Sequence, residues 1–220
     1  MTEKKHMITE QLAQFYAVEA QEYDRVYANP DVEDDLDELH DKIDEVLSGH
    51  KVLEIACGTG YWTQTLDEVA ESVLATDINV EMLELAKTRG FERVEFSLAD
   101  AFDLPADIGS FTACFAGFWW SHVKREDQER FLGQLRAKLG KDTVLVLVDD
   151  TYVDGHSDVI ARTDAEGNTY QFLTAIDGQR YEIIKNFPSD STLRKRLAAQ
   201  VREIRILRLE HYWLLSCRLK

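Results

Sequence analysis

The sequence predicts an α/β fold in which helices cover both faces of a doubly wound, mostly parallel sheet. Three observations predict it. Short apolar runs alternate with amphipathic segments between residues 51 and 148, which is the pattern of repeated strand–helix–strand units. The run 143–148 is continuous and rich in valine, as expected of a strand covered on both faces. The run 52–56 stops at the glycine turn 57–60, which is typical of a buried strand that passes into a helix.

Two amphipathic helices are predicted in the first 48 residues. Apolar side chains recur at helical spacing over residues 7–23 and again over residues 32–47. The second segment is also strongly acidic. Because such a charge run most often forms a solvated helix face, we assign no chemistry to it.

Seven strands are predicted after these helices. Five belong to the alternating region, and the two near the C-terminus are joined without room for a helix, so they must be antiparallel neighbours. Between residues 151 and 188 the alternation stops, and polar turns separate short extended pieces. We therefore interpret residues 1–220 as one domain with an inserted segment, 151–188. The predicted strands are residues 52–56, 72–76, 93–98, 111–116, 143–148, 202–209 and 212–219.

Composition narrows the class of protein. The chain has 220 residues, 45% of them hydrophobic, which is typical of a globular domain. Its formal net charge of −16 disfavours nucleic acid as a partner, since that recognition depends on cations that neutralise phosphates. No apolar run approaches the ~20 residues of a membrane-spanning helix, so no membrane association is expected. Three widely spaced cysteines, Cys57, Cys114 and Cys217, predict neither disulfides nor a metal site and fit a cytoplasmic location.

The glycine turn and the end of the next strand together indicate a nucleotide-type cofactor. Glycines let the backbone approach a ligand, and the following helix directs its first N–H groups at it. Asp77 ends the second strand, where a carboxylate can accept both hydroxyls of an adenosine ribose. The dinucleotide fingerprint G-x-G-x-x-G would need a glycine where this chain has Thr63, so a NAD(P)-dependent reductase is disfavoured.

The run 52–63 resembles motif I of the class I S-adenosylmethionine-dependent methyltransferases, in which an acidic residue precedes a series of glycines. Glu54 matches the acid, Gly58 and Gly60 match two of the glycines, and Ala56 stands at the first glycine position.

Further motifs follow in the family's order. Residues 75–78 look like the second motif, in which Asp77 would hold the ribose and Ile78 would lie on the adenine face. Residues 98–102 look like the third, in which Asp100 would meet the adenine amino group. The resemblance thus implies S-adenosylmethionine as the cofactor. The binding residues that it implies are Tyr16, Tyr23, Glu54, Ala56, Cys57, Gly58, Gly60, Trp62, Asp77, Ile78, Met82, Asp100, Ala101, Phe102, Ala116 and Trp119.

The resemblance also implies the architecture. It gives the strand order 3-2-1-4-5-7-6 with an antiparallel last strand, makes residues 1–48 lid helices, and places the insertion 151–188 over the acceptor site. The runs 58–63, 119–123 and 184–187 are similar to a narrower family, the small-molecule O-methyltransferases that include the dehydrophos phosphonate O-methyltransferase.

Methyl transfer from a sulfonium is an in-line displacement, so the protein must mainly orient the acceptor and exclude water. Two alternatives are open for the acceptor. An anion would need a cationic partner, for which Lys185 is the candidate, whereas a neutral hydroxyl would need a general base. His122 is the candidate base because it follows the carboxyl end of the fourth strand, where ligands bind in such sheets. Tyr27 follows the opening helix and is expected to close over the site.

We therefore expect methyl transfer to a small polar or acidic molecule, with oxygen the favoured acceptor atom. The alternatives are N-methylation of a small molecule and a non-catalytic scaffold that binds S-adenosylmethionine. A small-molecule acceptor is the expected partner, and the chain is expected to act as a monomer or homodimer.

Overall fold

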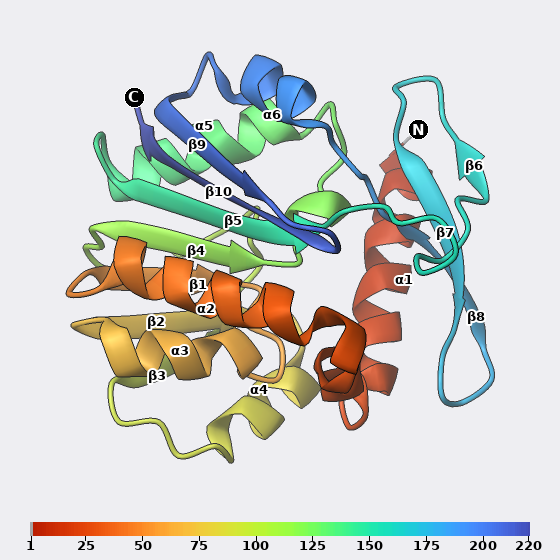
Figure 1. Cartoon of the computed structure of the whole chain (residues 1–220), viewed down its shortest axis with the longest axis horizontal. Helices are drawn as coiled ribbons and strands as arrows, with labels where there is room; N and C mark the ends of the chain where they lie inside the picture. Colours follow the sequence, from red (N-terminus) through yellow and green to blue (C-terminus); the bar gives the residue numbers. More distant parts are fainter. Residues whose placement is uncertain (1) are drawn as a thin grey trace.

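The computed structural model describes residues 2–220, with side chains from residue 10 onward, as a central sheet with helices on both faces and a small second sheet at one end (Figure 1). The strand order of the central sheet is β3-β2-β1-β4-β5-β10-β9. Neighbouring strands from β3 to β5 run parallel, and β10 is antiparallel to both β5 and β9. The prediction of a doubly wound sheet in the order 3-2-1-4-5-7-6 is confirmed, with β9 and β10 as its sixth and seventh strands. The strands are β1 (Lys51–Ile55), β2 (Ser72–Asp77), β3 (Val94–Leu98), β4 (Ala113–Gly117), β5 (Val144–Asp150), β9 (Val201–Arg208) and β10 (Tyr212–Leu219).

Two hydrophobic clusters lie on opposite faces of this sheet. Along β5, Val144 and Val146 belong to one cluster, while Leu145 and Leu147 belong to the other. Successive side chains of a strand point to opposite faces, so a strand with a core on each side must be apolar throughout. This explains the continuous run that predicted a central strand. The helices over the two faces are α2 (Glu33–Leu47), α3 (Tyr61–Val69), α4 (Val80–Lys87), α5 (Gln128–Leu139) and α6 (Asp190–Leu197).

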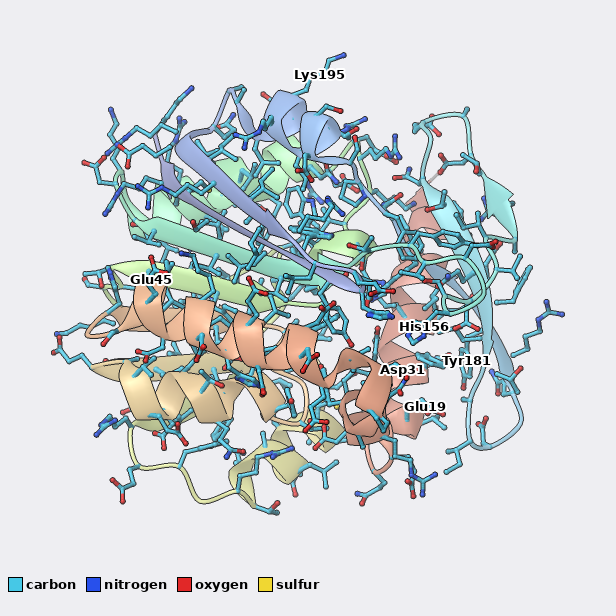
Figure 2. All side chains as sticks on the ribbon, in the orientation of Figure 1. Glu19, Asp31, Glu45, His156, Tyr181 and Lys195 are labelled. Carbon is cyan, nitrogen blue, oxygen red and sulfur yellow. The ribbon has the colours of Figure 1, made fainter. Side chains whose placement is uncertain are left out.

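The inserted segment forms a three-stranded antiparallel sheet of its own. Its strands are β6 (Arg162–Thr163), β7 (Thr169–Thr174) and β8 (Arg180–Ile184), in that order. Helix α1 (Thr2–Glu19) lies beside this sheet, as Figure 1 shows, and the contact is apolar. Figure 2 shows Glu19, His156 and Tyr181 in this region, whereas Glu45 and Lys195 project from the outer surfaces of α2 and α6.

The structure corrects two expectations about the N-terminal segment. The opening helix ends at Glu19 instead of reaching residue 23, and the chain continues as the 3-10 helix η1 (Tyr23–Ala28). Helix α2 is not a lid, because Leu39 and Ile43 on its apolar stripe are fully buried in the core of the central sheet.

Among the described residues, no helix combines the length and the hydrophobicity needed to cross a membrane. The three cysteines are buried free thiols.

Candidate active site

The turn after β1 is built from residues in the left-handed conformation. Gly58 has φ +56° and Gly60 has φ +82°, values that favour glycine. A Cβ on Gly60 would also come within 3.1 Å of the Ala86 methyl group, so α4 packs directly against this backbone. Ala56 has φ +54° although it carries a side chain. That conformation costs about 1–2 kcal/mol, which explains why the resembling motif uses glycine at this position.

Asp77 connects this turn to the end of β2. Its Oδ2 accepts a hydrogen bond from the Gly58 N–H at 2.9 Å, and its Oδ1 accepts one from the Asn79 N–H at 2.8 Å. Burial raises the pKa of Asp77, while these backbone hydrogen bonds act to lower it. A carboxylate has about four acceptor positions, so at most two remain for hydroxyl donors.

A cavity opens in front of the turn and of Asp77. Most of the predicted cofactor residues lie on its wall, along the carboxyl ends of β1, β2 and β3. We call this cavity the cofactor cavity. The predicted residues that line it are Tyr16, Tyr23, Ala56, Cys57, Gly58, Trp62, Asp77, Ile78, Met82, Asp100, Ala101, Phe102 and Trp119.

Three predicted cofactor residues do not line the cavity. Glu54 is buried behind it and accepts a hydrogen bond from the Thr63 hydroxyl at 2.7 Å. Burial raises the pKa of Glu54 to about 8. Gly60 faces α4, and Ala116 is enclosed within β4, where it is fully buried.

The short helix η1 is tied to the glycine turn. Thr59 donates its hydroxyl proton to Asp24 Oδ1 at 2.5 Å. Arg89 donates to the Thr59 carbonyl oxygen at 2.7 Å and also pairs with the Asp24 carboxylate. Sequence reasoning did not identify Thr59 or Arg89, because their contact with Asp24 depends on how η1 folds back over the turn.

A second cavity, called here the acceptor cleft, lies between η1, α1 and the small sheet. It shares Tyr16, Tyr23, Tyr27 and Phe118 with the cofactor cavity. The first three rings meet edge to face, with centroids 5.5 Å apart from Tyr16 to Tyr23 and 6.1 Å apart from Tyr23 to Tyr27. Tyr27 also packs edge to face on Phe118 at 5.9 Å. The two cavities therefore meet at a group of four aromatic side chains, called here the aromatic junction.

Phe118 was missed by sequence reasoning, although it follows β4 directly. Its backbone has φ +55°, a left-handed conformation that is unusual for a bulky residue. The Phe118 N–H donates to the Val148 carbonyl oxygen at 2.7 Å, which fixes the turn against β5. Strain of this kind concentrates at functional sites, where the surrounding structure holds it in place.

His122 lies on the wall of the cofactor cavity and is 9% exposed. Its Nδ1 lies 2.5 Å from the Ile184 carbonyl oxygen, which can only accept, so Nδ1 carries the proton. In the neutral ring Nε2 is then an acceptor, and the Tyr16 hydroxyl donates to it at 2.8 Å. Burial, and after it the positive charge of Lys185, lowers the pKa of His122 to about 3. The ring is therefore neutral and has a fixed tautomer.

Lys185 lies on the acceptor cleft instead of the cofactor cavity. Its Nζ is 2.5 Å from Asp150 Oδ2 and 3.4 Å from Asp149 Oδ1. Burial acts to lower the pKa of Lys185, but these two carboxylates hold it well above its usual value. The predicted anion clamp is thus a charged lysine that is already paired.

The side chains that line the cofactor cavity fit an adenosine-containing group. Asp77 offers acceptors for ribose hydroxyls, and Ile78 and Met82 offer apolar surface for a purine ring. Among the side chains that the structure describes, residues 10–220, no group of three or more His, Cys, Asp or Glu is arranged to hold a metal ion.

Comparisons with known proteins find methyltransferases. A family described as a methyltransferase domain matches residues 52–142. Methyltransferase GfsG of Streptomyces halstedii is 30% identical over 159 residues, covering 70% of this chain and 54% of that protein. Demethylmenaquinone methyltransferase of Clavibacter sepedonicus is 40% identical over 79 residues, covering 35% of this chain and 32% of that protein. The chain thus spans about half the length of the first relative and about a third of the second.

Among solved structures, the complex of DhpI with SAH is 28% identical to this chain, with a TM-score of 0.79, and covers 97% of this chain and 98% of DhpI. DhpI in complex with SAM and HEP has a TM-score of 0.76 and the same identity. Residues 52–142 thus match a methyltransferase domain, and nearly the whole chain shares the fold of DhpI, with the glycine turn and the sheet order described above.

Proposed function

We propose that the protein transfers the methyl group of S-adenosylmethionine to an oxygen atom of a small polar molecule. The observation that carries this proposal is the aromatic junction, where the cofactor cavity and the acceptor cleft share four side chains. Methyl transfer needs the two reactants in contact at a place from which water is excluded. A junction lined by rings between two cavities satisfies both needs.

The cofactor cavity supplies groups for each part of the cofactor. Asp77 would accept the ribose hydroxyls, Ile78 and Met82 would cover the adenine ring, and Asp100 would receive its amino group. When bound, S-adenosylmethionine supplies a methyl group on a positively charged sulfur. The chain's own residues then have to orient the acceptor and remove its proton.

His122 and Tyr16 form a route for that proton. The Tyr16 hydroxyl donates to His122 Nε2, and its remaining lone pair can accept a proton from an acceptor hydroxyl in the junction. As the acceptor oxygen forms its bond to the methyl carbon, its proton moves to Tyr16 Oη and the Tyr16 proton moves to His122 Nε2. The Ile184 carbonyl oxygen holds the other ring nitrogen in the protonated form throughout.

Similarity to the methyltransferases GfsG and DhpI supports the reaction class. Binding and turnover test the proposal separately. S-adenosylhomocysteine should raise the melting temperature of the protein by mass action, whereas NAD should not. Equal stabilisation by both compounds would contradict the cofactor assignment.

Turnover is tested with methyl-labelled S-adenosylmethionine and a panel of small alcohols, phenols and amines. Label should appear on oxygen. Label on amines alone would replace O-methylation by N-methylation, and cofactor binding without any label transfer over the whole panel would favour a non-catalytic scaffold.

A further inference from the structure

Every lysine and arginine on the described wall of the acceptor cleft is already paired. Lys185 lies between Asp150 and Asp149, at 2.5 and 3.4 Å. Arg25 pairs with Glu22, the residue before η1, and is 76% exposed, so its charge is largely screened by water. An anionic acceptor would therefore find no unpaired lysine or arginine on the described wall of the acceptor cleft.

Carboxylates outnumber these cations on the same wall. Besides the paired acids, Glu19 lies there and accepts a hydrogen bond from the Ile176 N–H at 2.6 Å, and Asp158 lies at the exposed edge. An anion that enters the cleft gives up its hydration and meets a net negative wall. The cleft thus disfavours the acidic acceptors that the sequence had left open.

The surface nearest the cofactor cavity is aromatic. Tyr16, Tyr23, Tyr27 and Phe118 present ring faces and edges there, and Phe15 and Ile183 continue the apolar surface toward the small sheet. Aromatic side chains in such edge-to-face groups are well suited to hold another ring. This surface fits an acceptor with an apolar, ring-sized body.

The proton route at the junction adds an independent argument. The Tyr16 hydroxyl and His122 Nε2 are hydrogen bonded at 2.8 Å, and Nδ1 is held by Ile184. An ionised acceptor oxygen has no proton to give up, so it would not use the Tyr16–His122 pair. A neutral hydroxyl must lose its proton and therefore needs this pair as a base.

Building on the proposed function, we propose that the acceptor is an uncharged hydroxyl compound with a ring-sized apolar body, of which phenol is the simplest probe. Asp150 determines this preference, because it is the nearer carboxylate partner of Lys185, the one buried cation on the described wall of the acceptor cleft. The oxygen of the hydroxyl forms the new bond to the methyl carbon, the carbon–sulfur bond breaks with its electrons on sulfur, and the hydroxyl proton leaves through Tyr16 to His122.

Three probes with the same ring and different charge test the inference: phenol, benzoate and phenylphosphonate. Their affinities are measured by calorimetry on the protein saturated with S-adenosylhomocysteine. Phenol should bind at least about 10-fold more tightly than either anion. Tighter or equal binding of an anion, or no binding of phenol, would overturn the inference.

The substitution Asp150→Asn tests the cause. It removes the charge of the nearer of the two carboxylates that pair with Lys185 and leaves only Asp149, so benzoate and phenylphosphonate should gain about 10-fold in affinity while phenol changes less than about twofold. Glu95→Gln, an exposed position on β3 that lines neither cavity, is the matched control for the loss of one negative charge and should change none of the three. Unchanged anion affinity in a folded Asp150→Asn protein would show that Asp150 does not set the preference.

If Asp150→Asn fails to fold, the ranking of the probes on the unaltered chain still decides. Failure of the proposed function gives a different result. In that case S-adenosylhomocysteine would not stabilise the protein, whatever the ranking of the three probes.

Discussion

Replacing Glu54 by glutamine should remove a strong pH dependence of stability. The Glu54 side chain is 1% exposed, and its one described hydrogen bond comes from the Thr63 hydroxyl. Burial is the largest cause that raises its pKa to about 8, and the nearby Asp77 carboxylate adds to the effect. Glutamine has nearly the same shape and can still accept from Thr63, but it has no charge to bury.

The sign follows from proton binding. In the unfolded chain Glu54 releases its proton near pH 4.5, whereas in the folded protein it keeps the proton up to about pH 8. Between these values the folded state binds more protons, so the free energy of unfolding must fall as the pH rises. The difference is between 3 and 4 pH units, and each unit is about 1.4 kcal/mol, so the loss is roughly 5 kcal/mol by pH 8.

Urea unfolding at pH values from 5 to 9 measures this loss. The free energy of unfolding of the unaltered protein should decrease through this range relative to that of Glu54→Gln. The exposed substitution Glu95→Gln is the control and should follow the unaltered protein. Parallel curves for the unaltered protein and Glu54→Gln would show that the buried carboxyl group is not the origin of the pH dependence.

Four further predictions concern the site. Asp77→Ala should weaken S-adenosylhomocysteine binding about 10- to 100-fold by calorimetry, as expected for a lost pair of charge-assisted hydrogen bonds; unchanged affinity in a folded variant would place the ribose elsewhere. Arg89→Met removes the ion pair between Arg89 and Asp24 of η1. Because this pair is partly exposed, the dissociation rate of S-adenosylhomocysteine in stopped flow should rise only about two- to fivefold. An unchanged rate would mean that the ion pair does not hold η1 over the cofactor. Ala56→Gly removes about 1–2 kcal/mol of backbone strain, but the more flexible unfolded chain costs about 0.5–1 kcal/mol, so urea unfolding should show a net gain in stability of about 0–1.5 kcal/mol; a clear loss would contradict the strain. His122→Gln should lower kcat about 10²- to 10⁴-fold. Because burial and the nearby lysine lower the pKa of His122 to about 3, the rate of the unaltered enzyme should not fall between pH 8 and pH 5. A decline in rate centred near pH 6.5 would oppose the role of His122 as a base.

The central sheet could be predicted because its signals are local. Alternating apolar runs and glycine turns are written in short stretches of sequence, and the buried faces of β5 leave a continuous run of apolar residues. The sheet β6–β8 was seen only as short extended pieces, because its pairing, such as Tyr170 opposite Ile184, depends on α1 covering it. Helix α2 shows the same limit, since an amphipathic stripe predicts a buried face but not which surface buries it.

The walls of the two cavities were predictable to different degrees. Asp77 and Asp100 follow strands of a parallel sheet, so their meeting at one edge follows from topology. The state of Lys185 does not. Its partners Asp149 and Asp150 lie at the end of β5, and Asp149 is 36 residues away from Lys185 in the sequence. Only the folded insertion brings the lysine amine against these carboxylates. A lysine in a candidate site is therefore evidence for an anion only after its neighbours are known.

The strained backbone of Phe118 at the aromatic junction is held in place by the contacts of its ring. Phe118 adopts φ +55° with a side chain that favours other conformations, so the strain must be balanced by what the ring contacts. Those contacts are Tyr27, Trp62 and Tyr212, with centroids 5.9, 5.9 and 5.4 Å away. They come from η1, α3 and β10, so the segment after α1, the helix after the glycine turn and the last strand all meet on one ring. A glycine there would relax the backbone but would remove a ring that lines both cavities and contacts three other aromatic side chains, so the strain at Phe118 is the cost of keeping that ring at the junction.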